Sequence, residues 1–518
     1  MRRGMRSKAM LRVMAAACVA AAIGAMAVRA QTPKASDAAR IEQIEKNTAL
    51  IEQGGGKPPI QLPLTELMEK YRVPGLSIAV IENFQIAWVR CYGVIEAGSS
   101  QPVTPRTLFQ AGSISKPVAA TAALWMVEQG KLSLDTNVND TLKSWKVPDN
   151  EFTRTEKVTL RRLMSHTGGL TVHGFPGYDV DDKLPTIVEV LNGEKPANTA
   201  PVRVDFVPGT KFRYSGGGVT IEQLMMTEVS GKKFPDLMRE VVLDKIGMTD
   251  SSYQQPLLRE RSAMTAGGTD GAGKLIHGRW HIYPEMAAAG LWTTPTDLAK
   301  FAIEIANSRN GKSNKILSEK MATQMLTPTM DARVGLGFFM DKKVPAQFGH
   351  DGADEGFQAL LSMNYQTGNG FAIMANSDFG IATASWLARA VAREYGWTYA
   401  AEENWVEDLY LLAELRGAQA ALARYEEKTA SMEPEARERS LNGFGYLLLQ
   451  GGMTQQAIQV FQKNVENFPK SSNVYDSLGE AYMAAGMKQK AIENYEKSLE
   501  LNPKNENAKE KLKQLRSN

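Results

Sequence analysis

The chain contains little cysteine and little histidine, with two Cys and five His among 518 residues. Cys18 lies within an apolar N-terminal segment. If that segment is removed, Cys91 remains alone and no intrachain disulfide can form. Because cysteine is among the most buried residue types, we expect Cys91 to be a buried strand residue. His277 and His281 have the spacing of a metalloprotease pair but lack the Glu that follows the first His. We therefore expect no metal site there and no cofactor.

A strong net charge is also missing. The formal charge is +3, but six basic residues and no acidic ones fall within residues 1–30, so removal of that segment leaves a net charge of −3. This balance lacks the basic excess of a nucleic-acid-binding protein, and we expect no nucleic-acid partner. The composition, 43% hydrophobic and 23% charged, excludes a mainly disordered chain. No phosphate-binding glycine loop is present in the sequence.

Residues 1–30 have the order of a secretory signal peptide, with a basic start, the apolar run Val13–Val28 and the small residue Ala30. The run is shorter than the ~20 residues that span a bilayer. We therefore expect an exported protein of the bacterial envelope, periplasmic or secreted. An uncleaved segment would instead be a membrane tether, and the sequence leaves this alternative open. Residues 31–57 predict a linker that contains one weakly amphipathic helix and ends in a glycine-rich break.

A candidate nucleophile lies at the start of a long apolar helical pattern. Proline is tolerated only near the first turn of a helix, so Pro117 places Ser113 at the helix N-terminus, where free backbone amides stabilise a developing oxyanion. Lys116 lies one turn away and can remove the hydroxyl proton once its own pKa falls. The spacing therefore predicts a serine nucleophile with a lysine base. A second Ser-x-x-Lys, Ser230–Lys233, lies in a polar turn, where we expect no chemistry.

Strand patterns occur at both ends of residues 58–400, and helical patterns lie between them. Leu76–Ile81 and Gln85–Tyr92 predict a β-hairpin. Further strands are expected at Val334–Met340, Gly356–Tyr365 and Phe371–Asn376, and helices at Gly217–Ser230, Phe234–Ile246, Leu298–Asn307 and Ala382–Tyr395. Thr296 or Asp297 is the expected cap of the third helix. The order predicts an α+β fold, with one antiparallel sheet built from distant segments and a helical region against it.

The last part of the chain contains a repeat with a period of 34 residues. Residues that match at this spacing are Gly445 and Gly479, Gly452 and Gly486, Ala457 and Ala491, Phe461 and Tyr495, and Pro469 and Pro503. This is the tetratricopeptide period, with small residues where two helices touch. The pattern predicts an all-α tetratricopeptide module over 441–518, joined by a helical connector at 401–440. Such repeats serve as a groove for a protein or peptide partner or as a stabilising appendage, and both interpretations stay open.

Two later blocks of the sequence contain further candidate site residues. Tyr214 stands in Pro208–Gly218, a glycine-rich turn into a helix, and His350 stands in Gly349–Phe357, at the start of a strand. With the Ser113 motif, and with Leu163–Leu170 and Ala288–Trp292 between them in order, these blocks resemble the serine β-lactamase-related superfamily. That superfamily includes class C β-lactamases, DD-peptidases, D-aminopeptidases and family VIII-type esterases. The resemblance covers roughly residues 60 to 396.

The resemblance implies a β-lactamase/transpeptidase-like fold and a role for each matched residue. Ser113 resembles the nucleophile, Lys116 its activating base and Tyr214 a second general base and acid. His350 falls where many members have the Lys of a Lys-Thr-Gly motif, and it precedes Gly352 and Ala353 in the substrate-binding strand. The oxyanion hole would consist of the backbone N–H groups of Ser113 and Ala353. His166 is expected to pack a loop and to have no catalytic role.

Two departures from the family pattern bear on the substrate. Gly216 replaces the Asn of the usual Tyr-x-Asn motif, and His350 replaces a lysine that would anchor a carboxylate. A histidine is mostly neutral at pH 7 and anchors a carboxylate weakly. We therefore expect a serine hydrolase that acts on an ester or small amide. The alternatives are a β-lactamase or D-amino-acid peptidase (DD-carboxypeptidase), and a catalytically silent ligand-sensing scaffold that acts through its repeats.

Overall fold

The structure is a computed structural model that describes residues 35–330, 334–398 and 405–517. The described residues form two compact units, one that includes residues 35–43 and reaches from 65 to 388, and another that includes residues 44–64 and continues from 389. The expected signal peptide, including Cys18, lies outside the described residues. Among the helices that are described, none combines the length and the apolarity needed to cross a membrane.

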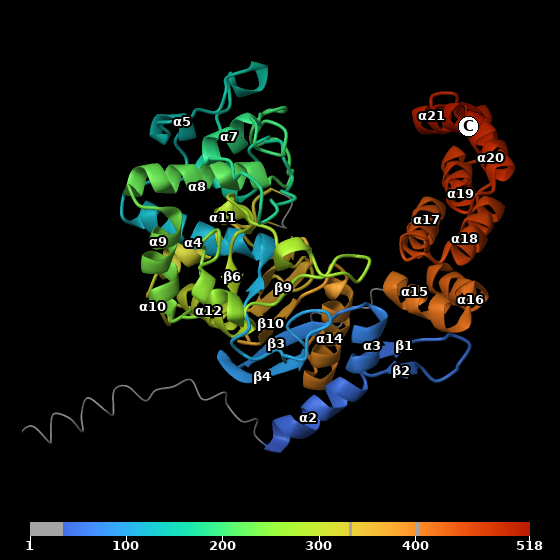
Figure 1. Cartoon of the computed structure of the whole chain (residues 1–518), viewed down its shortest axis with the longest axis horizontal. Helices are drawn as coiled ribbons and strands as arrows, with labels where there is room; N and C mark the ends of the chain where they lie inside the picture. The colour runs from blue at the N-terminus through green and yellow to red at the C-terminus, as the bar shows by residue number, and fades with distance from the viewer. Residues whose placement is uncertain (1–34, 331–333, 399–404, 518) are drawn as a thin grey trace, which may run out of the picture. The chain divides into compact units, whose positions relative to one another are not determined.

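The first unit is built on a six-stranded antiparallel sheet with the order β4-β3-β10-β9-β8-β7 (Figure 1). Its strands are β3 (Gly75–Glu82), β4 (Gln85–Gly93), β7 (Phe339–Met340), β8 (Gln347–Asp354), β9 (Phe357–Asn364) and β10 (Gly370–Ala375). Ile373 of β10 lies opposite Ile78 of β3 on one side and Leu360 of β9 on the other. Strands from the two ends of the unit therefore share one sheet, and the α+β class predicted from the sequence is confirmed.

The predicted hairpin is β3 and β4. Its turn residues Asn83 and Phe84 both have positive φ, as a type I′ turn requires. Cys91 lies on β4 opposite Ser77 and is half-buried, with its Sγ 3.4 Å from the Ser77 Oγ. The strand expected at Val334–Met340 is shorter than predicted, because only Phe339–Met340 pair with β8.

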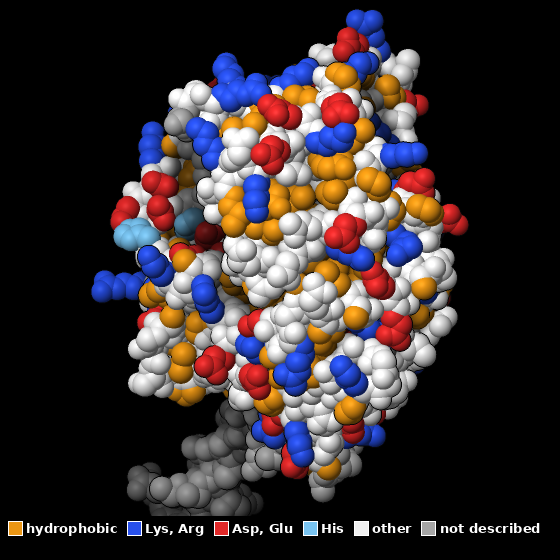
Figure 2. Space-filling model, turned by 90° about the vertical axis from the view of Figure 1, so that its right-hand side faces the viewer, with side chains coloured by type: hydrophobic (Ala, Val, Ile, Leu, Met, Phe, Trp, Pro, Cys, Tyr) orange, Lys and Arg blue, Asp and Glu red, His pale blue; other side chains and the backbone are white. Residues whose placement is uncertain are grey.

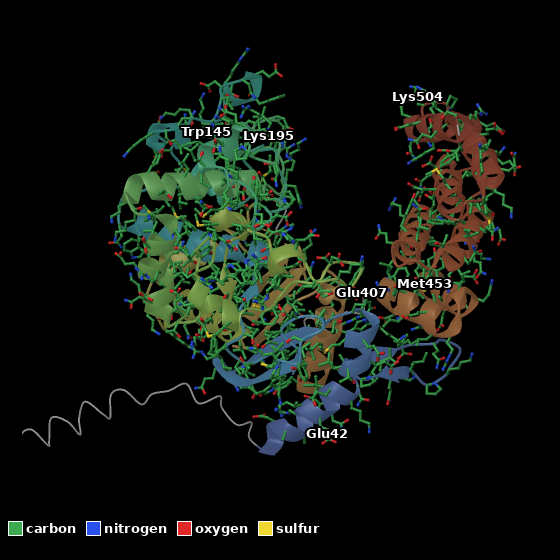
Figure 3. The ribbon with its side chains drawn as sticks, viewed as in Figure 1. Glu42, Trp145, Lys195, Glu407, Met453 and Lys504 are labelled. Carbon is green, nitrogen blue, oxygen red and sulfur yellow. The ribbon has the colours of Figure 1, made fainter. Side chains whose placement is uncertain are left out.

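A helical region accompanies this sheet, as expected. Its helices are α4 (Ser115–Glu128), α5 (Val138–Thr141), α6 (Leu160–Met164), α7 (Ile187–Asn192), α8 (Gly216–Ser230), α9 (Phe234–Met238), α10 (Asp244–Ile246), α11 (Met286–Ala289), α12 (Pro295–Arg309) and α13 (Glu319–Met325). A π-helical turn, Arg239–Leu243, joins α9 to α10. Trp145 lies in this region (Figure 3), and its indole Nε1 donates to Asn192 Oδ1 at 2.8 Å. The division between the two units falls within α14 (Gly380–Tyr395).

Helix α12 packs against β3, β4, β9 and β10, and it begins earlier than the sequence predicted. The expected cap, Thr296 or Asp297, is wrong. Thr294 caps the helix, and its side chain accepts a hydrogen bond from the Asp297 N–H at 3.2 Å. Pro295 then occupies the first turn, where its missing N–H costs nothing. The Asp297 carboxylate instead accepts from Ser251 Oγ at 2.9 Å, so tertiary contacts fix this residue.

The second unit contains the hairpin β1 (Ala49–Ile51) and β2 (Ile60–Leu62), and seven helices of its described residues. These are α15 (Trp405–Arg416), α16 (Ala418–Thr429), α17 (Pro434–Gln450), α18 (Thr454–Asn467), α19 (Ser472–Ala484), α20 (Lys488–Leu501) and α21 (Glu506–Ser517). The helix expected within residues 31–57 is α2 (Ala35–Lys46), where Ile41 and Ile44 are buried, whereas Ile51 is buried in the hairpin, which the expected linker did not include.

The 34-residue period appears in the packing of the second unit. A Cβ placed at Gly445 would lie 2.5 Å from the ring of Phe461, and one at Gly479 would lie 3.1 Å from the ring of Tyr495. Each glycine thus lets an aromatic side chain of the following helix approach the backbone. Met453 lies at the turn between α17 and α18 (Figure 3). On the face that Figure 2 shows, Lys and Arg side chains are interspersed with Asp and Glu.

Candidate active site

The segment that contains Ser113 is held between distant parts of the first unit. A short pair of strands, β5 (Phe109–Gln110) and β6 (Trp292–Thr293), precedes it. The Ala111 N–H donates to the Leu291 carbonyl at 2.9 Å, and Leu291 N–H donates to Ser115 Oγ at 3.0 Å. Ser113 itself is half-buried in a tight helical turn, Gly112–Ile114, directly before α4. The serine therefore lies at a helix N-terminus, as its distance from Pro117 suggested.

Lys116 and Ser113 are in direct contact. The Nζ of Lys116 lies 2.9 Å from the Oγ of Ser113 and 2.7 Å from the carbonyl oxygen of Ala288, and the lysine side chain is 4% exposed. As an ammonium, the lysine donates to both oxygens. As a neutral amine, it can accept the Oγ proton at the same distance. The geometry therefore suits proton transfer from the hydroxyl to the amine.

The segment that carries the Ala288 carbonyl is held by a glutamine of α8. Gln223 is buried, its Nε2 donates to the Pro284 carbonyl at 3.1 Å, and its Oε1 accepts from the Ala287 N–H at 2.7 Å. Both contacts belong to the segment around α11. Within the Ala288–Trp292 block, Ala288 contributes the carbonyl that accepts the hydrogen bond from Lys116.

Strand β8 contacts the nucleophile turn, Gly112–Ile114, which contains Ser113. Gly112 has a φ of +50°, and a Cβ there would lie 2.5 Å from the Ala353 nitrogen. A Cβ at Gly352 would lie 1.9 Å from the Ala111 carbonyl oxygen. Two glycines thus allow two backbones to touch, with Ala353 exposed beside the half-buried Ser113. The structure brings together the two residues whose N–H groups the family resemblance assigns to the oxyanion hole.

Tyr214 precedes α8 and lies beside the lysine. The Lys116 Nζ is 5.0 Å from the centroid of the Tyr214 ring. Three of the five histidines surround this ring, with centroid distances of 4.3 Å for His166, 4.9 Å for His173 and 6.1 Å for His350. The three expected catalytic side chains therefore meet at one place, with Ser113 from the turn before α4, Lys116 from the start of α4 and Tyr214 from the segment before α8.

His350 lies on β8 and is 4% exposed. A carbonyl can only accept, so the Nδ1 of His350, which lies 2.5 Å from the Asp351 oxygen, carries a proton. Burial and, to a smaller extent, the charge of Lys116 lower the pKa of His350 to about 3, against the opposing effect of the hydrogen bond to Asp351. The imidazole is therefore neutral at pH 7, and its Nε2 has no hydrogen-bond partner within the described residues.

Two buried acids near this place were missed by the sequence analysis. Burial raises the pKa of Asp354 well above its usual range, against the opposing effects of Lys116 and the Gly112 N–H. Burial also raises the pKa of Glu285, which precedes α11, to about 7. Asp354 lies in the Gly349–Phe357 block but was given no role there, and Glu285 lies outside every matched block, so only burial in the tertiary structure marks these acids.

A comparison with protein-family models gives the β-lactamase family over residues 63–394. The chain belongs to the β-lactamase family. Among curated relatives of this family, penicillin-binding protein 4 of Amycolatopsis lactamdurans is 28% identical over 61% of this chain and 84% of its own length. A β-lactamase of Pseudomonas fluorescens is 29% identical over 53% and 71%.

Solved structures show the same fold. An octameric penicillin-binding protein homologue from Pyrococcus abyssi is 24% identical, with a TM-score of 0.52 over 64% of this chain and 76% of that chain. A penicillin-binding protein from Bacillus halodurans is 21% identical, with a TM-score of 0.50 over 63% and 99%. Residues 472–505 match the tetratricopeptide repeat, which confirms the predicted repeats at the C-terminus.

Other sequence patterns lie elsewhere in the unit. Ser230 ends α8, and Gly231 with a φ of +66° separates it from Lys233, which is exposed. His277 and His281 do not converge on a common ligand, because their Nε2 atoms pair with Asp181 at 3.0 Å and with Asp179 at 3.3 Å. Within the described residues, no group of His, Cys, Asp and Glu has the arrangement of a metal site.

Proposed function

We propose that this protein is an exported serine hydrolase that forms an acyl-enzyme on Ser113 and hydrolyses a neutral ester or small amide. The observation that carries the proposal is the 2.9 Å contact between Ser113 Oγ and the buried Lys116 Nζ. A hydroxyl becomes a competent nucleophile when an adjacent base takes its proton. The half-buried serine beside the exposed Ala353 leaves the nucleophile open to a substrate carbonyl.

In the proposed acylation, Ser113 Oγ attacks the substrate carbonyl carbon while its proton passes to Lys116. A C–O bond forms to the serine, and the oxyanion faces the N–H groups of Ser113 and Ala353. The intermediate then expels the alcohol or amine, which receives the proton through Lys116 and Tyr214. In deacylation, water attacks the acyl carbon while its proton passes to Lys116. The carboxylic acid is then released and Ser113 Oγ takes the proton back.

Two features of the site support a substrate that is not bound at β8 through a carboxylate group. The neutral His350 offers a nitrogen lone pair that has no partner among the described residues, where a lysine would offer a cation. At Gly216, a Cβ would lie 3.0 Å from the Phe175 ring and 3.1 Å from the His173 carbonyl oxygen. A substrate-binding asparagine therefore has little room there. Both features favour esters and small amides over substrates recognised through a carboxylate.

The two Ser-x-x-Lys sequences provide a matched control. In the purified chain, we expect a fluorophosphonate probe to label the wild type and Ser230→Ala but not Ser113→Ala, and p-nitrophenyl acetate hydrolysis to follow the same order. Labelling that survives Ser113→Ala would refute the acyl-enzyme on this residue. Absence of labelling in the wild type would favour the ligand-sensing scaffold.

A β-lactamase or D-amino-acid peptidase is the second candidate, because named relatives include a β-lactamase and a penicillin-binding protein. A panel of p-nitrophenyl esters, a chromogenic cephalosporin and D-alanyl peptides separates the two. The proposal expects the esters to have the highest kcat/KM. A cephalosporin hydrolysed faster than the esters would establish the second candidate.

The remaining parts of the proposal concern the localisation of the protein and a binding partner of its repeats. The signal-like residues 1–30 support export, which cell fractionation of the full-length chain tests. The tetratricopeptide repeats support a protein or peptide partner. The second unit has a polar hollow of 280 Å³ between α16 and α18, where Lys463 pairs with Glu426 at 3.2 Å.

A further inference from the structure

We propose that His166 is a positioning residue that holds Tyr214 in its orientation for proton transfer, an inference that rests on the function proposed above. His166 follows α6 and is 3% exposed. It contacts the backbone on both sides of Tyr214. Its carbonyl oxygen accepts from the Arg213 N–H at 2.8 Å, and its Nδ1 accepts from the Ser215 N–H at 3.2 Å.

The ring of His166 provides a third contact. Its centroid lies 4.3 Å from the centroid of the Tyr214 ring, with 36° between the planes. Two hydrogen bonds therefore fix the backbone at residues 213 and 215, and the ring contact limits rotation of the phenol between them. His166 thus contacts both the backbone that flanks Tyr214 and the Tyr214 ring, at the shortest centroid distance of the three histidines around that ring. Misplacement of a reacting group by about 1 Å can cost a hundredfold in rate.

The hydrogen bond from Ser215 defines the tautomer of His166. A backbone N–H can only donate, so Nδ1 is unprotonated and the neutral ring carries its proton on Nε2. Burial is the main reason that the pKa of His166 lies well below its ordinary value, and the charge of Lys116 acts in the same direction. The acceptor that Ser215 needs is therefore present at neutral pH.

The start of α8 is held by other contacts. Ser215 Oγ accepts from the Gly218 N–H at 3.0 Å and donates to the Thr171 carbonyl at 2.7 Å. The Gly216 N–H donates to the His173 carbonyl at 3.0 Å. Because these bonds do not involve His166, loss of its side chain should loosen Tyr214 while α8 remains capped. This separates a positioning role from a purely structural one.

The backbone of His166 has a φ of +55°, which limits the substitutions that test its side chain. Glycine and asparagine both tolerate this left-handed conformation. The Oδ1 of asparagine occupies a place similar to that of the histidine Nδ1 and accepts hydrogen bonds. His166→Gly therefore removes the acceptor and the ring, whereas His166→Asn restores the acceptor without new backbone strain.

The experiment measures kcat and KM for p-nitrophenyl acetate, the fluorophosphonate labelling rate of Ser113 and the melting temperature, all in the full chain. We expect His166→Gly to lower kcat and the labelling rate by about ten- to a hundredfold with KM within threefold of wild type. His166→Asn should recover at least half of the lost activity on a logarithmic scale. A folded His166→Gly variant with wild-type kcat overturns the proposal, as does an asparagine variant as slow as the glycine variant.

A double-mutant cycle tests whether the effect passes through Tyr214. In a Tyr214→Phe background, His166→Gly should change kcat less than twofold, because the group that it positions is already absent. A full additive loss would overturn the proposal. If the glycine variant does not fold, a folded His166→Asn variant that loses more than tenfold in kcat also overturns it. Failure of the wild type to be labelled would instead refute the proposed function itself.

Discussion

Replacing Gly112 by alanine tests how closely β8 must approach the nucleophile turn. Gly112 has a φ of +50°, a conformation that costs a non-glycine residue about 1–2 kcal/mol. The new Cβ would also lie 2.5 Å from the nitrogen and 2.7 Å from the carbonyl carbon of Ala353, whereas ordinary contact begins at 3.4 Å. The two backbones would have to separate by about 0.9 Å at the oxyanion hole, a shift that can cost about a hundredfold in rate.

The matched control is Gly231→Ala, at the end of α8. Gly231 has a φ of +66°, and a Cβ there would meet nothing within 4 Å. Both substitutions carry the same backbone cost, but only Gly112→Ala moves β8. We expect the melting temperature to fall in both variants, and further in Gly112→Ala because of the clash, with kcat/KM for p-nitrophenyl acetate reduced about a hundredfold only in Gly112→Ala. Wild-type kcat/KM in Gly112→Ala, or an equal loss in Gly231→Ala, would refute the reasoning.

Three further predictions concern the lysine, the buried histidine and the repeats. Lys116→Met should lower kcat at least about a hundredfold because the base is lost, which steady-state kinetics would measure. His350 has a folded-state pKa of about 3, below its unfolded value of about 6.5, so the unfolded state binds the extra proton and stability falls as pH decreases below 6.5. This residue should account for about 2 kcal/mol of the decrease in the free energy of unfolding between pH 7.5 and pH 5. In His350→Gln, the free energy of unfolding measured with urea should therefore decrease by about 2 kcal/mol less over the same pH range. Gly443→Ala should raise the melting temperature of the second unit, because alanine stabilises a helix by about 0.5–1 kcal/mol relative to glycine. No atom lies within 4 Å of a Cβ placed at Gly443, so no clash opposes this gain. Gly445→Ala should lower the melting temperature, because its Cβ would lie 2.5 Å from the Phe461 ring; the same sign for both variants would contradict the packing.

Local patterns were sufficient for much of the fold. The hairpin of β3 and β4 follows from two apolar runs and a short turn, and the repeats follow from matches at 34 residues. These features depend on near neighbours in the chain, so the sequence carries them directly. The Ser113 to Lys116 spacing is of the same kind, because one helical turn places both side chains on one face. The 2.9 Å contact between them agrees with that spacing.

Contacts between distant segments could not be found in this way. Thr294 caps α12, whereas the Asp297 carboxylate accepts a hydrogen bond from Ser251. Ile41, Ile44 and Ile51 are buried in a segment whose composition resembles a linker. His166 gave no chemical signal in the sequence, since its meaning depends on the Tyr214 backbone 48 residues further along. The family blocks, the repeats and the serine–lysine pair could be predicted from the order of residues and from local periodicity alone. The tertiary structure alone decided which groups surround the phenol, which acids are buried and how closely β8 meets the nucleophile, because burial and close approach arise only when separate segments pack together.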